Sequence, residues 1–224
     1  MPTASESRRA LTLVAATAVD AAVQLLADLQ GPARVDDLLD AAPALIAYYA
    51  DGTSALAADL YDDERERAGA KGRFVAEPVV ADRSEKIRRG LLWSVQPMFE
   101  PLPATVESRL AEVVQLETAR PYRDTITTNT RRDPQSRGWE RVASGTGCKF
   151  CRMLADRGAV YKDTTVWFAS HAHCHCSARP VFAGGQYGPE ASAMQYLAST
   201  NRRTASSRAR LRDYLTKNFP DAPG

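Results

Sequence analysis

The placement of the cysteines and histidines constrains this chain more than any other feature of its sequence. All four cysteines and all three histidines lie within residues 148–176, and none occurs elsewhere among the 224 residues. They form a Cys148-x-x-Cys151 pair, a gap of 19 residues, and the run His171-Ala-His173-Cys174-His175-Cys176. Thiolate and imidazole groups at this spacing are typical of a tetrahedral zinc site. The pattern predicts a small domain organised around one metal ion.

Two disulfide bonds, or four unrelated buried thiols, are the alternatives to a metal site. A bond within Cys148–Cys151 or within Cys174–Cys176 would close a very short loop, and the second loop would be strained. The N-terminal sequence lacks a basic segment followed by a long apolar run, so we expect no signal peptide and a reducing compartment. The sequence therefore favours zinc.

The N-terminal apolar stretch is not expected to enter a membrane. Asp20, Gln24 and Asp28 interrupt the run from Leu11 to Leu29 with polar groups. We expect a protein that is made in solution and has no membrane partner.

Zinc takes four ligands, and the sequence offers more candidates than it needs. We expect Cys148 and Cys151 to supply the first two. Residues two apart on an extended chain point to the same side, so Cys174 and Cys176 can reach one ion, and His171 can replace one of them. Four thiolates, or three thiolates and one imidazole, would make a closed, structural site. The second pair of ligands comes from His171, His173, Cys174, His175 and Cys176, and which two of these five bind stays open.

A catalytic zinc site would need an open coordination position and a general base beside it. The sequence has no His-x-Glu motif, and its Cys-x-x-Cys pair precedes the histidines, unlike the zinc deaminase pattern. A nuclease in which one histidine acts as the base is the alternative, but the histidines stand among the ligands. We therefore expect that the protein is not an enzyme.

Charge is distributed unevenly, although the net charge is only +2. Residues 1–133 carry 16 Lys and Arg against 21 Asp and Glu, whereas residues 134–224 carry 13 against 6. The basic C-terminal part is sufficient for a phosphate-facing surface. The side chains expected to neutralise phosphates without reading bases are Arg202, Arg203, Arg208, Arg210, Arg212 and Lys217. An ordinary solvated helix packed through its apolar residues is the alternative.

Apolar residues recur at steps of three and four and predict helices over residues 5–29, 35–68, 82–95 and 104–130. Pro43 and Gly52 are expected to kink or divide the second of these helices, and Pro121 the last.

The composition changes after residue 133, where shorter elements are expected. The later sequence predicts short strands near 139–144, 160–161, 166–168 and 178–182, a helix over 149–156, and a final helix from Glu190 to about Asn218. The predicted fold class is mainly α, with a long-helix region over 1–133, a small zinc-stabilised α+β domain over 134–183, and a loop with a basic C-terminal helix over 184–224.

The motifs between residues 139 and 182 form a series that can be compared with known families. They read Trp139-x-Arg141-Val142-Ala143, Cys148-Lys149-Phe150-Cys151, Leu154-x-x-Arg157-Gly158-Ala159-Val160-Tyr161, and His171 to Cys176. This series resembles the MuF-like phage head morphogenesis family, whose CxxC, Gly-x-x-Tyr and HxxCxC pattern falls on these residues. Residues 139–182 match closely, whereas the long-helix region fits only in general character.

The resemblance implies a minor capsid protein of a tailed phage, similar to those of phages that infect actinobacteria. Such a protein would be made in the host cytoplasm and lie in the head interior or at the portal vertex in low copy number. Its implied partners are portal and major capsid or scaffolding proteins, and packaged DNA through the basic tail, with no small-molecule substrate. A zinc-dependent nucleic-acid-binding protein or nuclease in the host cytoplasm is the alternative.

Overall fold

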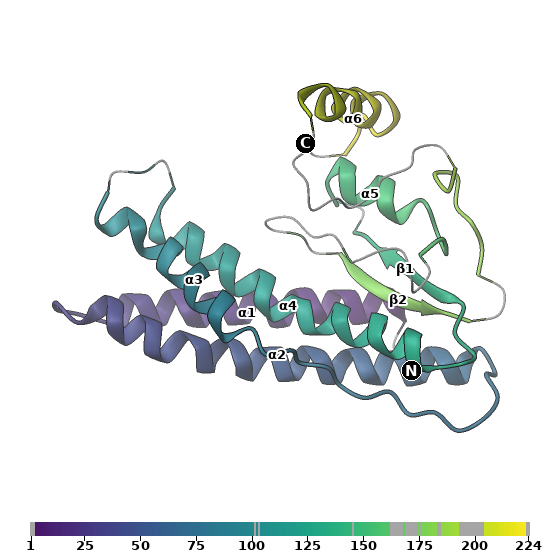
Figure 1. Ribbon diagram of the computed structural model, residues 1–224, viewed down its shortest axis with the longest axis horizontal. Coiled ribbons are helices and arrows are strands. Elements are labelled where there is room, and N and C mark those ends of the chain that lie inside the picture. The colour runs from purple at the N-terminus through teal and green to yellow at the C-terminus, as the bar shows by residue number, and fades with distance from the viewer. Residues whose placement is uncertain are drawn as a thin grey trace. The chain divides into compact units, whose positions relative to one another are not determined.

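The computed structural model of the chain describes residues 3–100, 102, 104–144, 146–161, 168, 174, 176–182, 185–192 and 204–222. Within them lie six α-helices, one short 3-10 helix and two strands (Figure 1). The elements are α1 (Ala4–Asp28), α2 (Arg34–Arg67), α3 (Ser84–Val95), η1 (Gln96–Met98), α4 (Val106–Arg132), β1 (Gly138–Val142), α5 (Lys149–Ala155), β2 (Ser177–Val181) and α6 (Ala205–Asn218). The predicted class, mainly α with a small sheet, is confirmed.

The four helices predicted before residue 133 are present at close to their predicted ends. Neither helix is divided, since α2 continues through Pro43 and Gly52, and α4 continues through Pro121. That these residues kink the helices stays a prediction. A proline removes one backbone hydrogen bond and crowds the preceding turn. Burial of apolar side chains on both sides of Pro43, such as Leu39 and Ile46, outweighs that local cost.

The chain divides into two compact units. The helical unit comprises residues 9–59 and 76–125, and the sheet unit comprises residues 1–8, 60–75 and 126–224. The division runs through α2 and α4, so each of these helices contributes one end to each unit. The domain boundaries inferred from composition at residues 134 and 184 stay predictions.

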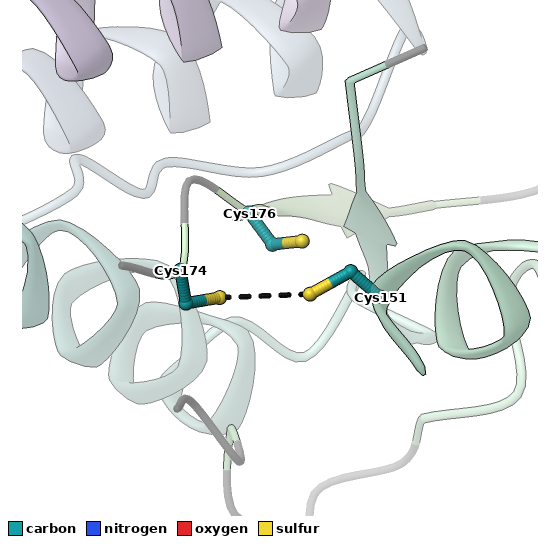
Figure 2. Close-up of side chains that lie close together, drawn as sticks. All are labelled: Cys151, Cys174 and Cys176. Atoms are coloured by element: carbon teal, nitrogen blue, oxygen red, sulfur yellow. Dashed lines mark hydrogen bonds between the residues drawn. The ribbon is translucent and has the colours of Figure 1, made fainter. Parts of the chain in front are cut away.

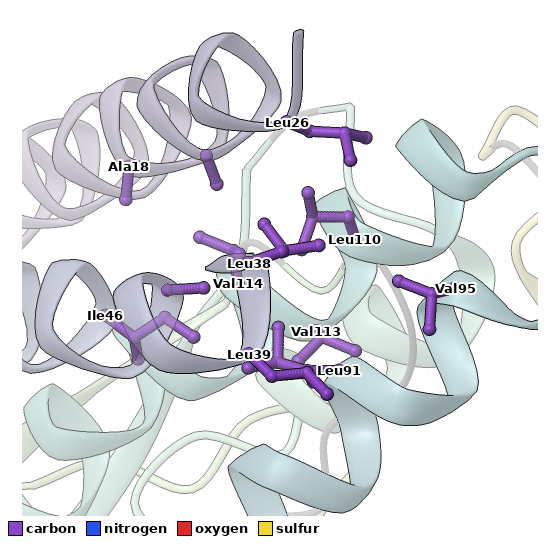
Figure 3. Packing of buried hydrophobic residues seen from close by; sticks show 12 residues of the cluster. Ala18, Leu26, Leu38, Leu39, Ile46, Leu91, Val95, Leu110, Val113 and Val114 are labelled. Carbon is purple, nitrogen blue, oxygen red and sulfur yellow. The ribbon is translucent and has the colours of Figure 1, made fainter. Parts of the chain in front are cut away.

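One hydrophobic core holds the helical unit together where α1, α2, α3 and α4 meet (Figure 3). Small side chains such as Ala18, Ala22 and Ala42 are fully buried in it, which lets the helices approach closely. A bidentate ion pair adds to the core, because Arg83 donates to both carboxylate oxygens of Glu117 at 2.6 and 2.8 Å. This unit therefore has a core of its own.

Helix α1 is long and apolar enough to cross a membrane by length and composition, a test that core helices also pass. One face of α1 is buried at helical spacing, through Leu11, Ala15, Ala18, Ala22 and Leu26. Through Ala18, Ala22 and Leu26, this face of α1 packs into the core of the helical unit.

The sheet unit contains one antiparallel pair of strands (Figure 1). In its register Trp139 lies opposite Pro180, and Arg141 lies opposite Ala178. Alternate residues share a face of a sheet, so Trp139 and Arg141 project to one side. On the other side, Arg179 and Glu140 form an ion pair of 3.0 Å. The strands predicted near 139–144 and 178–182 are thus confirmed. The one predicted at 160–161 is reduced to an isolated bridge between Tyr161 and Trp139, and residues 166–167 of the strand predicted at 166–168 lie outside the described residues.

Helix α6 begins at Ala205, so the prediction that it starts at Glu190 is wrong. Thr204 caps the helix, because its hydroxyl accepts a hydrogen bond of 3.1 Å from the amide of Ser207. Residues 190–192 form turns instead. Leu211 and Leu215 of α6 pack against α5 at Met153 and Leu154.

A tight backbone approach after α5 makes Gly158 difficult to replace. Its φ of +65° lies in the left-handed region, and an added Cβ would lie 2.5 Å from the Gln186 carbonyl oxygen. We expect Gly158→Ala to lower the free energy of unfolding by about 1–3 kcal/mol in urea denaturation. Gly52→Ala is the matched control. Gly52 lies inside α2 with open space around it, so alanine there should raise the free energy of unfolding by about 0.5–1 kcal/mol. Equal stability of both variants would contradict this account.

Candidate metal centre

Three cysteine sulfurs meet inside the sheet unit (Figure 2). Cys151 comes from α5, and Cys174 and Cys176 come from the segment that leads into β2. The three Sγ atoms all lie within 4.8 Å of one another, and those of Cys151 and Cys174 are 3.8 Å apart. Zinc–sulfur bonds of about 2.3 Å in a tetrahedron place sulfurs roughly 3.8 Å apart. The cluster could therefore hold a metal ion with little rearrangement.

These three cysteines are buried thiols rather than disulfides. Each is 2% exposed. None of the four cysteines forms a disulfide, and 3.8 Å is far longer than a sulfur–sulfur bond of about 2.05 Å. Such a dry pocket of soft sulfur atoms suits a thiophilic divalent cation.

Cys148 is the cysteine available to complete the set. It is the N-cap of α5, and its Sγ accepts a hydrogen bond of 3.5 Å from the amide of Cys151. Residues three apart on a helix are neighbours on its surface, and Cys148 packs against the cluster while partly exposed. The remaining predicted ligand, His171, lies outside the described residues, as do His173 and His175.

Hydrogen bonding within the cluster keeps the metal-free thiols protonated. Cys151 shares hydrogen bonds with Cys174 and Cys176, and these bonds, together with burial, raise the pKa of the Cys151 thiol. The hydrogen bond from Cys151 lowers the pKa of Cys176, but the bond to Cys174 and burial outweigh it and raise that pKa to about 11. A metal ion must displace these protons, so its affinity falls as the pH falls.

Aromatic side chains form one wall of the centre. The rings of Trp139 and Tyr161 stack with centroids 4.4 Å apart, and Phe168 stacks on Trp139 at 5.5 Å. Phe168 also packs against the cysteines, and Trp139 is 2% exposed. The wall shields the sulfurs from water on this side, as a structural metal site requires.

Comparison with known proteins adds the family. A family model described as VG15 protein matches residues 2–200, which include both the long helices and the cysteine cluster. The chain belongs to the VG15 protein family. This is a family of phage proteins, so the phage origin implied by the sequence motifs is confirmed. Neither a curated protein nor a solved structure matches the chain.

The basic tail of this VG15 chain is only partly described. Arg208, Arg210, Arg212 and Lys217 lie on α6 with exposed side chains. Arg202 and Arg203 lie outside the described residues. The apolar residues Leu211 and Leu215 of α6 pack on α5, and these four basic side chains flank them on both sides. Their contact with phosphates stays a prediction.

The fold buries charged side chains of this VG15 chain whose burial the sequence did not predict, among them Asp133 and Arg141. Asp133 is 3% exposed and pairs with Arg65, and Arg141 is 4% exposed beside the aromatic wall. Arg141 lies in the same sequence motif as Trp139, which was a partial sign that it belongs to this site. Arginine side chains are mostly exposed, so the sequence did not predict that this one is buried.

Proposed function

We propose that this phage protein is a minor capsid protein of the MuF-like kind, which joins the head at the portal vertex during assembly and is not an enzyme. The buried cysteine cluster carries the proposal, because it falls on the CxxC and HxxCxC positions that define the resemblance. Membership of a phage protein family supports it further.

We infer that the cluster binds one structural zinc ion through Cys148, Cys151, Cys174 and Cys176. The metal would join α5 to the segment before β2, two parts of the chain that are separated by more than twenty residues. A two-stranded sheet and a short helix bury little apolar surface, and small domains of this kind depend on such cross-links. A closed set of four thiolates leaves no open position for a reacting water.

Two further surfaces fit a role in assembly. Leu92, Trp93 and Phe99 expose large apolar side chains near the end of α3 in the helical unit, where a protein partner such as the portal would bind. The exposed basic side chains of α6, Arg208, Arg210, Arg212 and Lys217, would contact the phosphates of packaged DNA without reading its bases.

Quantitative mass spectrometry of gradient-purified particles tests this role. We expect the chain at a low, reproducible copy number relative to the portal protein. Phage carrying Cys151→Ser should lack the chain while keeping the portal, and phage carrying Met153→Leu, a volume-conserving change on the same helix, should retain it. Absence of the unchanged chain from particles would contradict the proposal and favour a protein acting in the host cytoplasm.

A further inference from the structure

We propose that Arg141 is the counter-charge of the cysteine centre: its buried guanidinium stabilises the negative charge of a zinc tetrathiolate and thereby sets the affinity for the metal. This inference rests on the proposed zinc site and extends it to a positioning residue that is not a ligand.

The need for a counter-charge follows from the ligand set. Four thiolates and one divalent cation carry a net charge of −2. Three of the sulfurs belong to residues that are 2% exposed, so water solvates this charge poorly. Buried charge is costly unless a charge of opposite sign lies nearby. A cation beside the site would therefore strengthen its binding of zinc.

Strand register places Arg141 beside the cluster. Arg141 lies opposite Ala178, and Cys176 precedes Ala178 by two residues. Alternate residues share one face of a strand pair. Cys176 immediately precedes β2, so in this register its side chain and that of Arg141 are diagonal neighbours on the same side of the two strands. Such neighbours lie about 7–8 Å apart at their backbones, a gap that a long arginine side chain spans.

The aromatic wall holds the guanidinium in that position. Its Cζ atom lies 3.8 Å from the centroid of the Phe168 ring, and Phe168 packs against the cysteines. The side chain of Arg141 is thus buried and stacked on an aromatic ring, which restricts its motion and fixes its charge in place.

The same pair of strands offers a matched control. Arg179 lies on β2, and its partner in the register is Glu140, so both project from the opposite face. Arg179 forms an ion pair of 3.0 Å with Glu140. It is an arginine on the same sheet whose charge is neutralised by a carboxylate, away from the sulfurs.

The test compares the full-length chain with Arg141→Met, Arg141→Lys and Arg179→Met. Methionine keeps an unbranched apolar side chain beside Phe168 but removes the charge, whereas lysine keeps the charge. Zinc affinity is measured by competition with a chromophoric chelator, and cobalt substitution reports thiolate ligands through their charge-transfer absorption. We expect Arg141→Met to bind zinc roughly 10- to 100-fold more weakly, as loss of an outer-shell partner does. Arg141→Lys should retain most of the affinity, and Arg179→Met all of it.

A second measurement separates charge from packing. At saturating zinc, the thiolates of Arg141→Met should react faster with iodoacetamide, because no cation offsets their negative charge. A purely structural role of Arg141 would leave that rate unchanged in the folded, zinc-loaded variant.

The outcomes distinguish the two proposals. Wild-type affinity and alkylation rate in folded Arg141→Met would overturn the counter-charge, while leaving the zinc site intact. No charge-transfer absorption in the unchanged chain would overturn the zinc site itself. If Arg141→Met does not fold, Arg141→Lys decides: affinity near that of the wild type supports the proposal, and a tenfold loss in a folded protein overturns it.

Discussion

We expect Cys151→Ser to abolish metal binding and to unfold the sheet unit, while the helical unit stays folded. Cys151 is buried at the centre of the cluster, in contact with Cys174 at 3.8 Å. Serine is a poor zinc ligand and would leave three thiolates around an incomplete site. Structural zinc contributes apparent binding free energies of about 10–16 kcal/mol, comparable to the whole stability of a domain. Loss of even part of that contribution exceeds what a small core can supply.

Hydrogen exchange read by mass spectrometry would locate this effect. Peptides of β1 and α5 should lose protection in Cys151→Ser, whereas peptides of α1 and α3 should keep it, because the helical unit has its own core. Chelation of the unchanged chain should reproduce the pattern, and added zinc should restore protection in that chain alone. Met153→Leu is the control and should retain one zinc per chain. A zinc-free Cys151→Ser chain with full protection of α5 would contradict a structural metal.

Asp133→Ala lowers the free energy of unfolding by about 3–5 kcal/mol, because it leaves the charge of Arg65 buried without its carboxylate. The Oδ2 atom of Asp133 accepts a hydrogen bond of 2.9 Å from Arg65, and Oδ1 accepts one of 2.9 Å from the amide of Gln135. The carboxylate is fully buried, and the guanidinium is 10% exposed. Tyr61 joins them through its hydroxyl, and burial, followed by the charge of Asp133, raises its pKa.

Urea denaturation measures this loss against a partly exposed ion pair on α2, the helix that carries Arg65. Glu64→Gln breaks the contact of Glu64 with Arg67, whose side chain is 40% exposed, and should cost about 0.5 kcal/mol or less. Replacing both buried partners, as in Arg65→Met with Asp133→Leu, should recover much of the stability, since no charge is then left uncompensated. A cost below about 1 kcal/mol for Asp133→Ala would contradict the buried network.

Local patterns predicted the helices and the cysteine cluster well, for a physical reason. Helical periodicity and metal-ligand spacing both depend on residues that are close together in the chain, so both can be recognised from the sequence. The cysteine spacing indicated one centre even though Cys151 and Cys174 belong to different elements, because soft ligands so rarely gather for another purpose. The continuity of α2 at Pro43 was not predictable in this way, since tertiary packing overrides local propensity.

The buried charges show where sequence reasoning ends. Arg65 and Asp133 lie 68 residues apart, and each stands in a stretch of other charged residues that predicts a solvated surface. Arg141 is buried only because β1 pairs with β2 in one register, and that register is a product of the whole fold. The start of α6 likewise depends on Thr204, one of several residues that could cap a helix.

X-ray absorption at the zinc K-edge of the purified, full-length chain tests the central claim most directly. We predict one zinc per chain with four sulfur neighbours at about 2.3 Å and no nitrogen or oxygen in the first shell. That result would establish Cys148 as the fourth ligand beside Cys151, Cys174 and Cys176. A nitrogen neighbour would mean that a histidine binds in place of Cys148, and it would contradict the four-thiolate centre. A chain without stoichiometric zinc would contradict the metal centre altogether.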